Sequence, residues 1–365
     1  MNARTMANAK GMRTLVIGGT EFIGRATVSA LLDVGAEVTL VNRGITPNPF
    51  GCSVRHVRCD RRQAEALSSV LEEGWDAVID FVAFEPTDVA PIISHRHKIC
   101  RYIVISTDSV YMACDPTRFE RGPSGRLLES SDNTFSEEHA RDDEYGAEKW
   151  RMEALLRRDG QGLDWLALRL PDVLGPHENT GRMDKLLLKL CKGRTIGTAL
   201  DGVPGGAQSL PLGVVFAADV ALAVCAALRP PAAPSIAAGA DSTSGGHSRQ
   251  RSLHICCTEA PTWPQLVEAA VTALRDAGLD VPPPRFHPAR DTGFCSVTFG
   301  ALDGSAALDA LGGWAPVALD DRWKESIEWW VGMLRERSER VVAVTAPAQT
   351  AGEAQRQPKR PLPDG

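Results

Sequence analysis

A tyrosine and a lysine four positions apart, Tyr145 and Lys149, are the residues of this chain that most directly suggest chemistry. On a helix, side chains with this spacing project from the same face and can interact. A neighbouring ammonium lowers the pKa of a phenol, so we expect Tyr145 to exchange a proton with a substrate hydroxyl or carbonyl. Proton transfer of this kind accompanies hydride exchange with nicotinamide, and the pair therefore indicates an oxidoreductase.

The beginning of the chain predicts a strand, a glycine-rich loop and a helix. Residues 13–17 are a short apolar run, residues 18–24 contain three glycines, and residues 26–32 carry apolar side chains at helical spacing. Glycines allow a tight turn and close helix packing, and free backbone N–H groups at the helix start can face a pyrophosphate. With a second strand at residues 37–41, the pattern predicts a dinucleotide-binding βαβ unit.

Two residues of this unit bear on the cofactor. Glu21 stands where the usual fingerprint has its middle glycine, and its carboxylate would repel a pyrophosphate unless it turns to solvent or meets Arg25 or Arg43. The second predicted strand ends in Asn42 and Arg43, where an acid would bind the ribose 2′-hydroxyl of NAD. Arginine suits the 2′-phosphate of NADP instead. The prediction is NAD or NADP, with a slight preference for NADP; a solvated surface arginine is the alternative.

Composition argues against several classes of protein. The chain has 365 residues, 43% of them hydrophobic, and a formal net charge of −6, which is unfavourable for binding nucleic acid or a membrane surface. No apolar stretch approaches the ~20 residues of a membrane span, and residues 1–11 lack the apolar core of a secretory signal. Nine cysteines without a C-x-x-C pair and eight histidines without ligand spacing predict reduced thiols, a cytoplasmic location and no metal site.

Alternating periodicity continues beyond the first unit. Four further strands are predicted at residues 54–57, 76–82, 102–106 and 163–170, and helices at 64–71, around 89–93, 183–190, 217–228, 263–277 and 320–334. Strands alternating with helices predict an α/β fold, a doubly wound parallel sheet of Rossmann type, with a smaller C-terminal substrate lobe.

The predicted division of the chain follows from this alternation and from composition. The dinucleotide-binding domain takes residues 12–170 and is completed by 212–258 with a flexible insertion at 230–251; the substrate-binding lobe takes 171–211 and 259–338; a disordered N-terminus takes 1–11 and a disordered tail 339–365.

The order of the motifs resembles that of the extended short-chain dehydrogenases/reductases, in the NAD-dependent epimerase/dehydratase superfamily, over roughly residues 12–335. The glycine loop has the variant form GGTEFIG. The matching segments are 18–24, 59–61, 81–84, 106–111, 145–149, 169–176, 302–305 and 311–316.

The resemblance implies a catalytic trio. Thr107 would hydrogen-bond the reacting oxygen, Tyr145 would be the acid/base, and Lys149 would hold the nicotinamide ribose. Dehydration is disfavoured because Ser109 replaces the glutamate that serves as base in the sugar dehydratases. The predicted cofactor contacts are Gly18, Thr20, Glu21, Phe22, Ile23, Gly24, Asn42, Arg43, Asp60, Arg61, Phe81, Val82, Ala83, Ser106, Tyr145, Lys149, Pro171 and Val173. The predicted substrate contacts are Thr107, Asp108, Asn179, Arg182 and Gln208.

The function predicted from these features is NAD(P)-dependent redox chemistry at a secondary alcohol or ketone of a nucleotide sugar or similar small molecule. An epimerase would retain NAD and return the hydride, whereas a reductase would use NADPH once. The alternative is a non-catalytic NADP- or RNA-binding protein, because the variant loop also resembles that of chloroplast stem-loop RNA-binding proteins. The acidic balance and the Tyr145/Lys149 pair argue against RNA. The resemblance also suggests a homodimer formed through the tyrosine helix.

Overall fold

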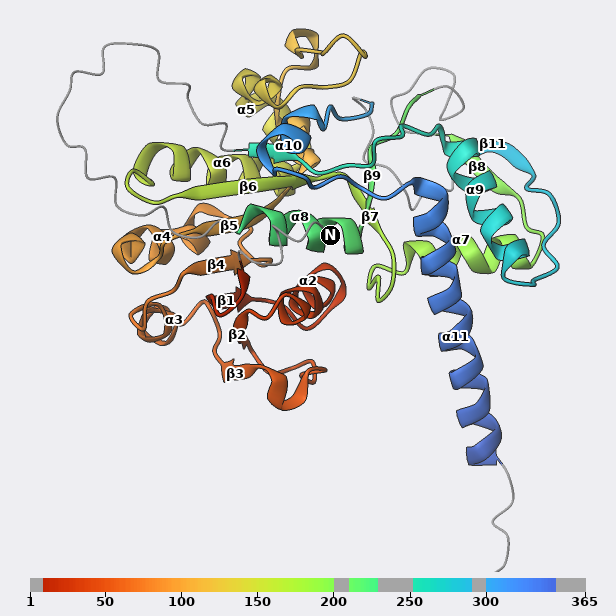
Figure 1. Ribbon diagram of the computed structural model, residues 1–365. Helices are drawn as coiled ribbons and strands as arrows, with labels where there is room; N and C mark the ends of the chain where they lie inside the picture. Colours follow the sequence, from red (N-terminus) through yellow and green to blue (C-terminus); the bar gives the residue numbers. More distant parts are fainter. Residues whose placement is uncertain (1–8, 200–209, 229–251, 291–299, 346–365) are drawn as a thin grey trace, which may run out of the picture.

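The computed structural model describes residues 9–199, 210–228, 252–290 and 300–345 (Figure 1). The predicted insertion at 230–251 and Gln208 lie outside the described residues. Two predicted disordered ends differ in part from the structure. Ala9 is buried in the core, and the Gly11 N–H donates to the Gly35 carbonyl over 2.8 Å. At the other end, the last helix, α11 (Leu319–Thr345), extends into the predicted tail.

A seven-stranded sheet forms the centre of the molecule, and all of its strands are parallel. Its order is β10-β6-β5-β4-β1-β2-β3, so the chain moves outward from β1 in one direction and then in the other. This is the predicted doubly wound α/β fold, which is confirmed. The strands are β1 (Arg13–Ile17), β2 (Glu37–Asn42), β3 (Arg55–Arg58), β4 (Ala77–Asp80), β5 (Tyr102–Thr107), β6 (Trp165–Leu170) and β10 (Ser252–His254).

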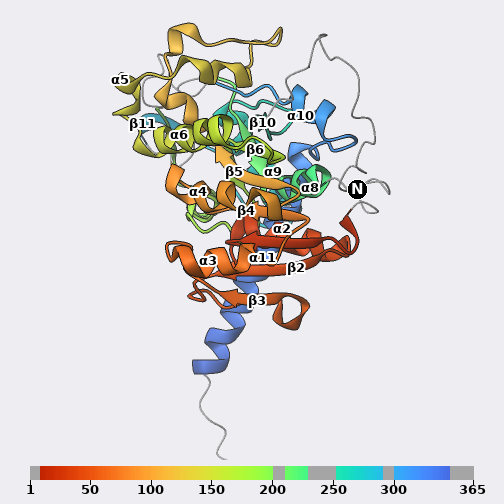
Figure 2. The same cartoon turned by 90° about the vertical axis from the view of Figure 1, so that its left-hand side faces the viewer.

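Helices cover both faces of the sheet, as the continuous apolar strands require. One face packs against α2 (Phe22–Asp33) and α8 (Ala217–Ala227), which contact each other closely. The other face packs against α3 (Ala64–Leu71), α4 (Pro86–Ser94) and α6 (Glu144–Asp159) (Figure 2). All six residues of β5 are buried between these layers.

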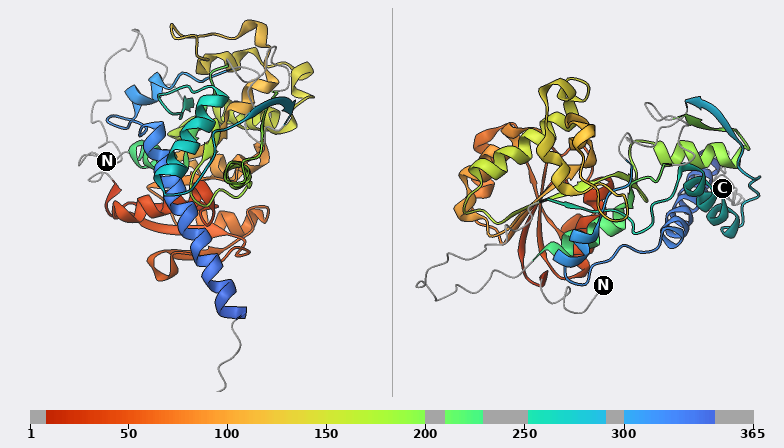
Figure 3. Two further views of the ribbon diagram at one scale, coloured as in Figure 1. Left: turned by 90° about the vertical axis from the view of Figure 1, so that its right-hand side faces the viewer. Right: turned by 90° about the horizontal axis from the view of Figure 1, so that it is seen from above.

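A smaller group of elements forms a second hydrophobic core beside the sheet (Figure 3). Helices α7 (Arg182–Cys191), α9 (Trp263–Asp276) and α11 pack around three buried tryptophans, Trp263, Trp323 and Trp330. The chain crosses between the two cores through β7 (Asp172–Leu174), which pairs with β9 (Val214–Phe216). The short pair β8 (Ile196–Ala199) and β11 (Phe286–Arg290) completes this part.

A network of buried ion pairs and hydrogen bonds holds the loop that follows β5. The guanidinium of Arg169 is fully buried and lies 2.7 Å from Glu153 of α6. It also donates to the Tyr111 hydroxyl and to the Glu129 carbonyl, over 2.8 and 3.0 Å. Although burial opposes the charge of Glu153, Arg169 lowers the pKa of this carboxyl to about 2. The network therefore joins β6 and α6 to the loop that follows β5.

That loop consists largely of short helical elements. It folds into η3 (Asp108–Ala113), η4 (Pro116–Arg118), η5 (Glu129–Thr134) and α5 (Glu137–Ala140). Short 3₁₀ segments of this kind show no hydrophobic period, so periodicity in the sequence does not reveal them. Across the described ranges, no helix combines the length and the apolar character needed to cross a bilayer.

Candidate active site

A cavity of about 650 Å³ opens at the carboxyl ends of five strands of the sheet, in the size range of small-molecule sites. It lies where the strand order reverses between β1 and β4, which is where open α/β sheets bind ligands. Of the residues predicted from the sequence, those that line it are Gly18, Thr20, Glu21, Phe22, Ile23, Gly24, Asn42, Arg43, Asp60, Arg61, Phe81, Val82 and Asn179.

The glycine loop allows its backbone to approach a phosphate group closely. A Cβ atom on Gly24 would lie 2.4 Å from the Gly18 carbonyl, and Gly18 itself has φ +86°. Helix α2 starts directly after this turn with no side-chain cap from a described residue and no acid in its first turn. Its first N–H groups and its dipole are therefore available to an anion at the cavity.

The carboxylate of Glu21 is held by two donors at the rim of the cavity. Thr46 donates to Oε1 over 2.6 Å, and Asn179 donates to Oε2 over 2.9 Å. These hydrogen bonds lower the pKa of Glu21. Of the two alternatives expected for Glu21, the structure agrees with solvent exposure and not with an arginine partner, and a threonine and an amide bind the carboxylate. Asn179, which was predicted to contact substrate, lines the same cavity as the glycine loop.

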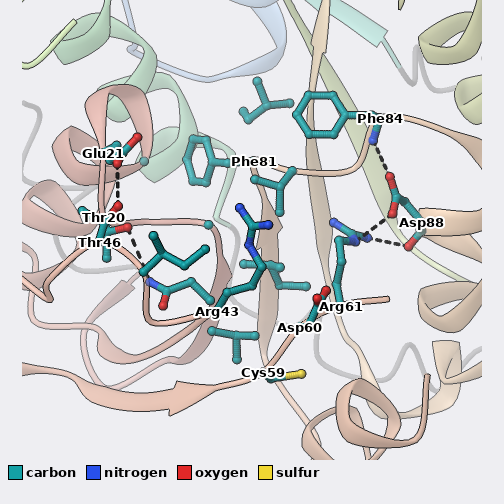
Figure 4. Close-up of a pocket in the computed structure, with 18 of the residues that line it drawn as sticks. Thr20, Glu21, Arg43, Thr46, Cys59, Asp60, Arg61, Phe81, Phe84 and Asp88 are labelled. Carbon is teal, nitrogen blue, oxygen red and sulfur yellow. Dashed lines mark hydrogen bonds and ion pairs between the residues drawn. The ribbon is translucent and has the colours of Figure 1, made fainter. Parts of the chain in front are cut away.

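The end of β2 presents one fixed polar side chain and one extended cation. The Asn42 amide oxygen accepts from the Gly44 N–H and the His56 ring, over 2.7 and 3.0 Å, so this side chain is committed to its loop. Arg43 is exposed and extends into the cavity (Figure 4). Within the described residues it forms no ion pair. Its charge is therefore available to an anionic part of a ligand.

Arg61 differs from Arg43 because carboxylates already neutralise it. Its guanidinium lies 2.8 Å from Asp80 and 2.9 Å from Asp88 (Figure 4). Burial disfavours the charge of Arg61, but the attraction of Asp80 outweighs this and raises its pKa. The neighbouring Asp60 accepts from the Arg62 N–H over 3.0 Å. Arg61 thus lines the cavity mainly as a structural cation between β4 and α4.

The predicted acid/base residues meet at the end of β5. The Thr107 hydroxyl accepts from the Ser109 N–H over 3.1 Å and lies near enough to Tyr145 to lower the pKa of its hydroxyl. Tyr145 lies in the first turn of α6, beside Gly146. A Cβ atom on Gly146 would approach the Ser109 carbonyl to 2.0 Å, so glycine lets this helix turn press against the strand end.

Lys149 is buried below the tyrosine. Its Nζ donates to the carbonyls of Ala83 and Ile105 over 2.7 and 2.8 Å, and it lies 5.9 Å from the centre of the Tyr145 ring. Burial lowers the pKa of Lys149 to about 8.

The predicted acidity of the phenol is wrong for this structure. Although 47% of Tyr145 is exposed, the atoms around its hydroxyl desolvate it and raise its pKa to about 12. The nearby Thr107 hydroxyl lowers the pKa but does not overcome this effect. Lys149 directs its ammonium to two main-chain carbonyls. The helical spacing alone had predicted that this charge would act on the phenol.

The other predicted site residues are less directly placed. Ser106 turns from the cavity and donates to Glu153 over 2.6 Å, and Val173 packs on the core. Neither Pro171 nor Ala83 lines the cavity, although the Ala83 carbonyl binds Lys149. Asp108 is buried and accepts from Thr107 over 3.3 Å. Arg182 pairs with Asp172, and its charge reaches Tyr145.

Sequence reasoning missed several residues of the site. Thr46 and Asp88 carry no motif, and only their side-chain contacts with Glu21 and Arg61 reveal them. Phe84 belonged to a predicted motif but was not selected. No cluster of three or more side chains suited to a metal ion occurs in the part of the chain that the structure describes.

Comparison with known proteins identifies the family. The NAD dependent epimerase/dehydratase family model matches residues 14–237, more than half of the chain. The chain belongs to this family. The match confirms the resemblance to the extended short-chain dehydrogenases/reductases.

Solved structures with the same fold are similar over most of the chain. UDP-glucose-4-epimerase from Stenotrophomonas maltophila, with bound NAD and formylated UDP-arabinopyranose, has a TM-score of 0.65 and 20% identity, covering 89% of this chain and 99% of that one. The Thermus thermophilus UDP-glucose 4-epimerase complex with NAD has a TM-score of 0.60 and 22% identity, covering 88% and 99%. At these identities the likeness shows the fold.

Two characterised relatives match shorter regions. The chloroplast stem-loop binding protein of 41 kDa b from Arabidopsis thaliana is 26% identical over 205 residues, which are 52% of this chain and 50% of that protein. A 2'-dehydrokanamycin reductase from Streptomyces kanamyceticus is 32% identical over 97 residues, 26% of this chain and 28% of that protein. The chain therefore spans half or less of the length of these relatives.

Proposed function

We propose that this protein is an NAD(P)-dependent oxidoreductase that acts on a secondary alcohol or ketone of a nucleotide sugar or similar small molecule. The observation that carries the proposal is the placement of Thr107, Tyr145 and a buried Lys149 together at the carboxyl end of β5, with the Lys149 Nζ 5.9 Å from the centre of the Tyr145 ring. The cavity lined by the glycine loop leads to this end of the sheet, since Ile105 of β5 lines it as well.

The residues of the site have distinct roles in this proposal. When bound, the nicotinamide accepts or supplies a hydride ion. With a pKa of about 12, the Tyr145 hydroxyl is protonated at neutral pH and can donate its proton to the oxygen of a ketone. Thr107 would hydrogen-bond the substrate oxygen that receives this proton. Lys149, charged below a pH of about 8, would hold the ribose of the nicotinamide nucleotide.

We favour NADP as the cofactor because of the contrast between two arginines. Arg61 is neutralised by Asp80 and Asp88, whereas Arg43 extends into the cavity with no ion pair to a described residue. A 2′-phosphate would supply the missing counter-charge. NADP that exchanges with solvent would favour the reductase reaction over the epimerase reaction.

An epimerase is the second candidate, and a specific contact supports it. Asn179 reaches across the cavity rim to Glu21, and such a bridge would slow the release of a bound dinucleotide. Retention of the cofactor is what an epimerase needs, because it must return the hydride. The similar epimerase structures with bound NAD agree with this candidate.

The cofactor that accompanies the purified protein tests these alternatives. Tightly bound NAD(H) would support the epimerase and exchangeable NADP(H) the reductase, whereas binding of neither would support a non-catalytic or RNA-binding protein. With a substrate in hand, Tyr145→Phe should lower turnover by about 10²–10⁴-fold without changing cofactor affinity. Thr117→Val, which removes a hydroxyl bonded to Asp115, is the control. Full turnover of Tyr145→Phe would contradict the proposed mechanism.

Two further expectations stay predictions. Pairing of two copies through α6 is one, and a cytoplasmic location is the other. Leu156 of this helix is fully buried in the core of its own chain. Trp150 stacks on Phe135 with ring centroids 4.0 Å apart, so a dimer would use other parts of this helix.

A further inference from the structure

Phe84 covers the ammonium group of Lys149. The ring centre lies 4.8 Å from Nζ, within the range of a cation–π contact. An ammonium has three N–H donors, and two of those of Lys149 are used by the carbonyls of Ala83 and Ile105. The ring therefore shields the remaining part of the charge, and the lysine residue is only 2% exposed.

The backbone of Phe84 is fixed while its ring is half open to solvent. The Phe84 N–H donates to Asp88 over 2.7 Å, and Asp88 is in turn held by Arg61 over 2.9 Å. In contrast, 47% of the Phe84 side chain is exposed, and its ring lines the cavity 6.4 Å from the ring of Tyr145. Figure 4 shows it at the edge of the cavity, directly beside Asp88. Ligand sites are lined mainly by apolar and aromatic side chains, and the Phe84 ring has such a position.

We propose that Phe84 is a positioning residue for Lys149, whose ring keeps water from the ammonium in the free protein and holds it against two carbonyls. This inference rests on the proposed function only for the identity of what later reaches Lys149, a cofactor ribose. The shield itself is a property of the free protein. In this proposal, the position of the Phe84 ring determines whether water reaches Lys149.

Two opposing effects follow from removing the ring, and their sizes predict the outcome. Loss of the cation–π contact destabilises the charged form of Lys149 and would lower its pKa. Entry of water relieves desolvation, which is the largest influence on Lys149 and lowers its pKa from 10.5 to about 8. Because desolvation is the larger effect, Phe84→Ala should raise the pKa of Lys149.

Acetylation of the free protein by acetic anhydride over a range of pH, read by peptide mass spectrometry, measures both access and protonation. The plateau rate at high pH reports access to Lys149, and the midpoint reports its pKa. In Phe84→Ala the plateau should rise by about tenfold or more, and the midpoint should move from about 8 toward 10.5. Lys324, which is exposed, serves as the reference within the same sample.

Two further variants separate shielding from general loosening. Phe84→Leu keeps apolar bulk over the ammonium and should stay close to wild type in both readouts. Phe135→Ala removes another ring packed on α6, one that lies 5.7 Å from Arg151, and should change neither. An unchanged plateau and midpoint in Phe84→Ala, or the same change in Phe135→Ala, would overturn the proposal. If Phe84→Ala does not fold, Phe84→Val gives the same test with a smaller change.

A cofactor arm distinguishes this inference from the proposed function. NADP or NAD should protect Lys149 from acetylation in the wild type if a ribose reaches it. Protection together with the Phe84 effect supports both proposals. A Phe84 effect without protection by either dinucleotide supports the shield and contradicts the proposed function.

Discussion

Replacing Lys149 by methionine should remove a contribution to stability that depends on pH. Burial lowers the pKa of Lys149 from 10.5 to about 8 in the folded protein. One pKa unit corresponds to about 1.4 kcal/mol, so the shift corresponds to about 3 kcal/mol. Because the folded pKa is the lower one, the unfolded chain binds more protons between these values, and the stability of the wild type rises with pH through that window.

The sign can be checked at the two limits. Below pH 8 the lysine is charged in both states, and the folded protein bears the whole cost of burying that charge. Above 10.5 it is neutral in both states and the cost is absent. Methionine carries no proton at any of these values. The free energy of unfolding of the wild type, minus that of Lys149→Met, should therefore rise by about 3 kcal/mol from pH 8 to 10.5.

Urea unfolding followed by tryptophan fluorescence measures this difference, because the chain has eight tryptophans. Taking wild type minus variant at each pH cancels the other groups that titrate in this range. Lys324→Met, which removes an exposed lysine, is the matched control and should give a difference that does not change with pH. A flat difference for Lys149→Met would refute the view that Lys149 is desolvated.

Three further predictions concern the cavity and the buried network. Arg43→Asp should weaken NADP binding by about 10–100-fold and leave NAD binding nearly unchanged, as isothermal titration calorimetry would show. Equal effects on both dinucleotides would mean that Arg43 does not recognise the 2′-phosphate. Glu21→Gln should tighten dinucleotide binding up to about tenfold by removing a charge near the pyrophosphate, whereas weaker binding would mean that the contact with Asn179 matters more. Arg169→Met should cost about 3–5 kcal/mol of unfolding free energy because Glu153 stays buried; a smaller loss in urea unfolding would mean that water reaches this carboxylate.

Local sequence patterns were sufficient to predict most of the fold and the position of the site. The apolar period of each strand and helix depends on neighbouring residues alone, so the predicted strand at 102–106 corresponds to β5 (Tyr102–Thr107) and the predicted helix at 64–71 to α3. The glycine loop is equally local, since its turn and helix start are continuous in sequence. These features were enough to predict a parallel sheet that begins with a βαβ unit whose glycine loop suits a dinucleotide.

The chemistry of individual side chains was decided by contacts between distant segments. Helical spacing correctly brought Tyr145 near Lys149, but it could not show that Ala83 and Ile105 would take the ammonium. Nor could it show that Asn179 would reach Glu21, 158 positions away. A pKa depends on all atoms within a few ångströms, whichever part of the chain supplies them. The sequence by itself therefore determined the fold and the place of the glycine loop, and the tertiary structure alone decided which other side chains reach the cavity and which charges are buried, paired or available.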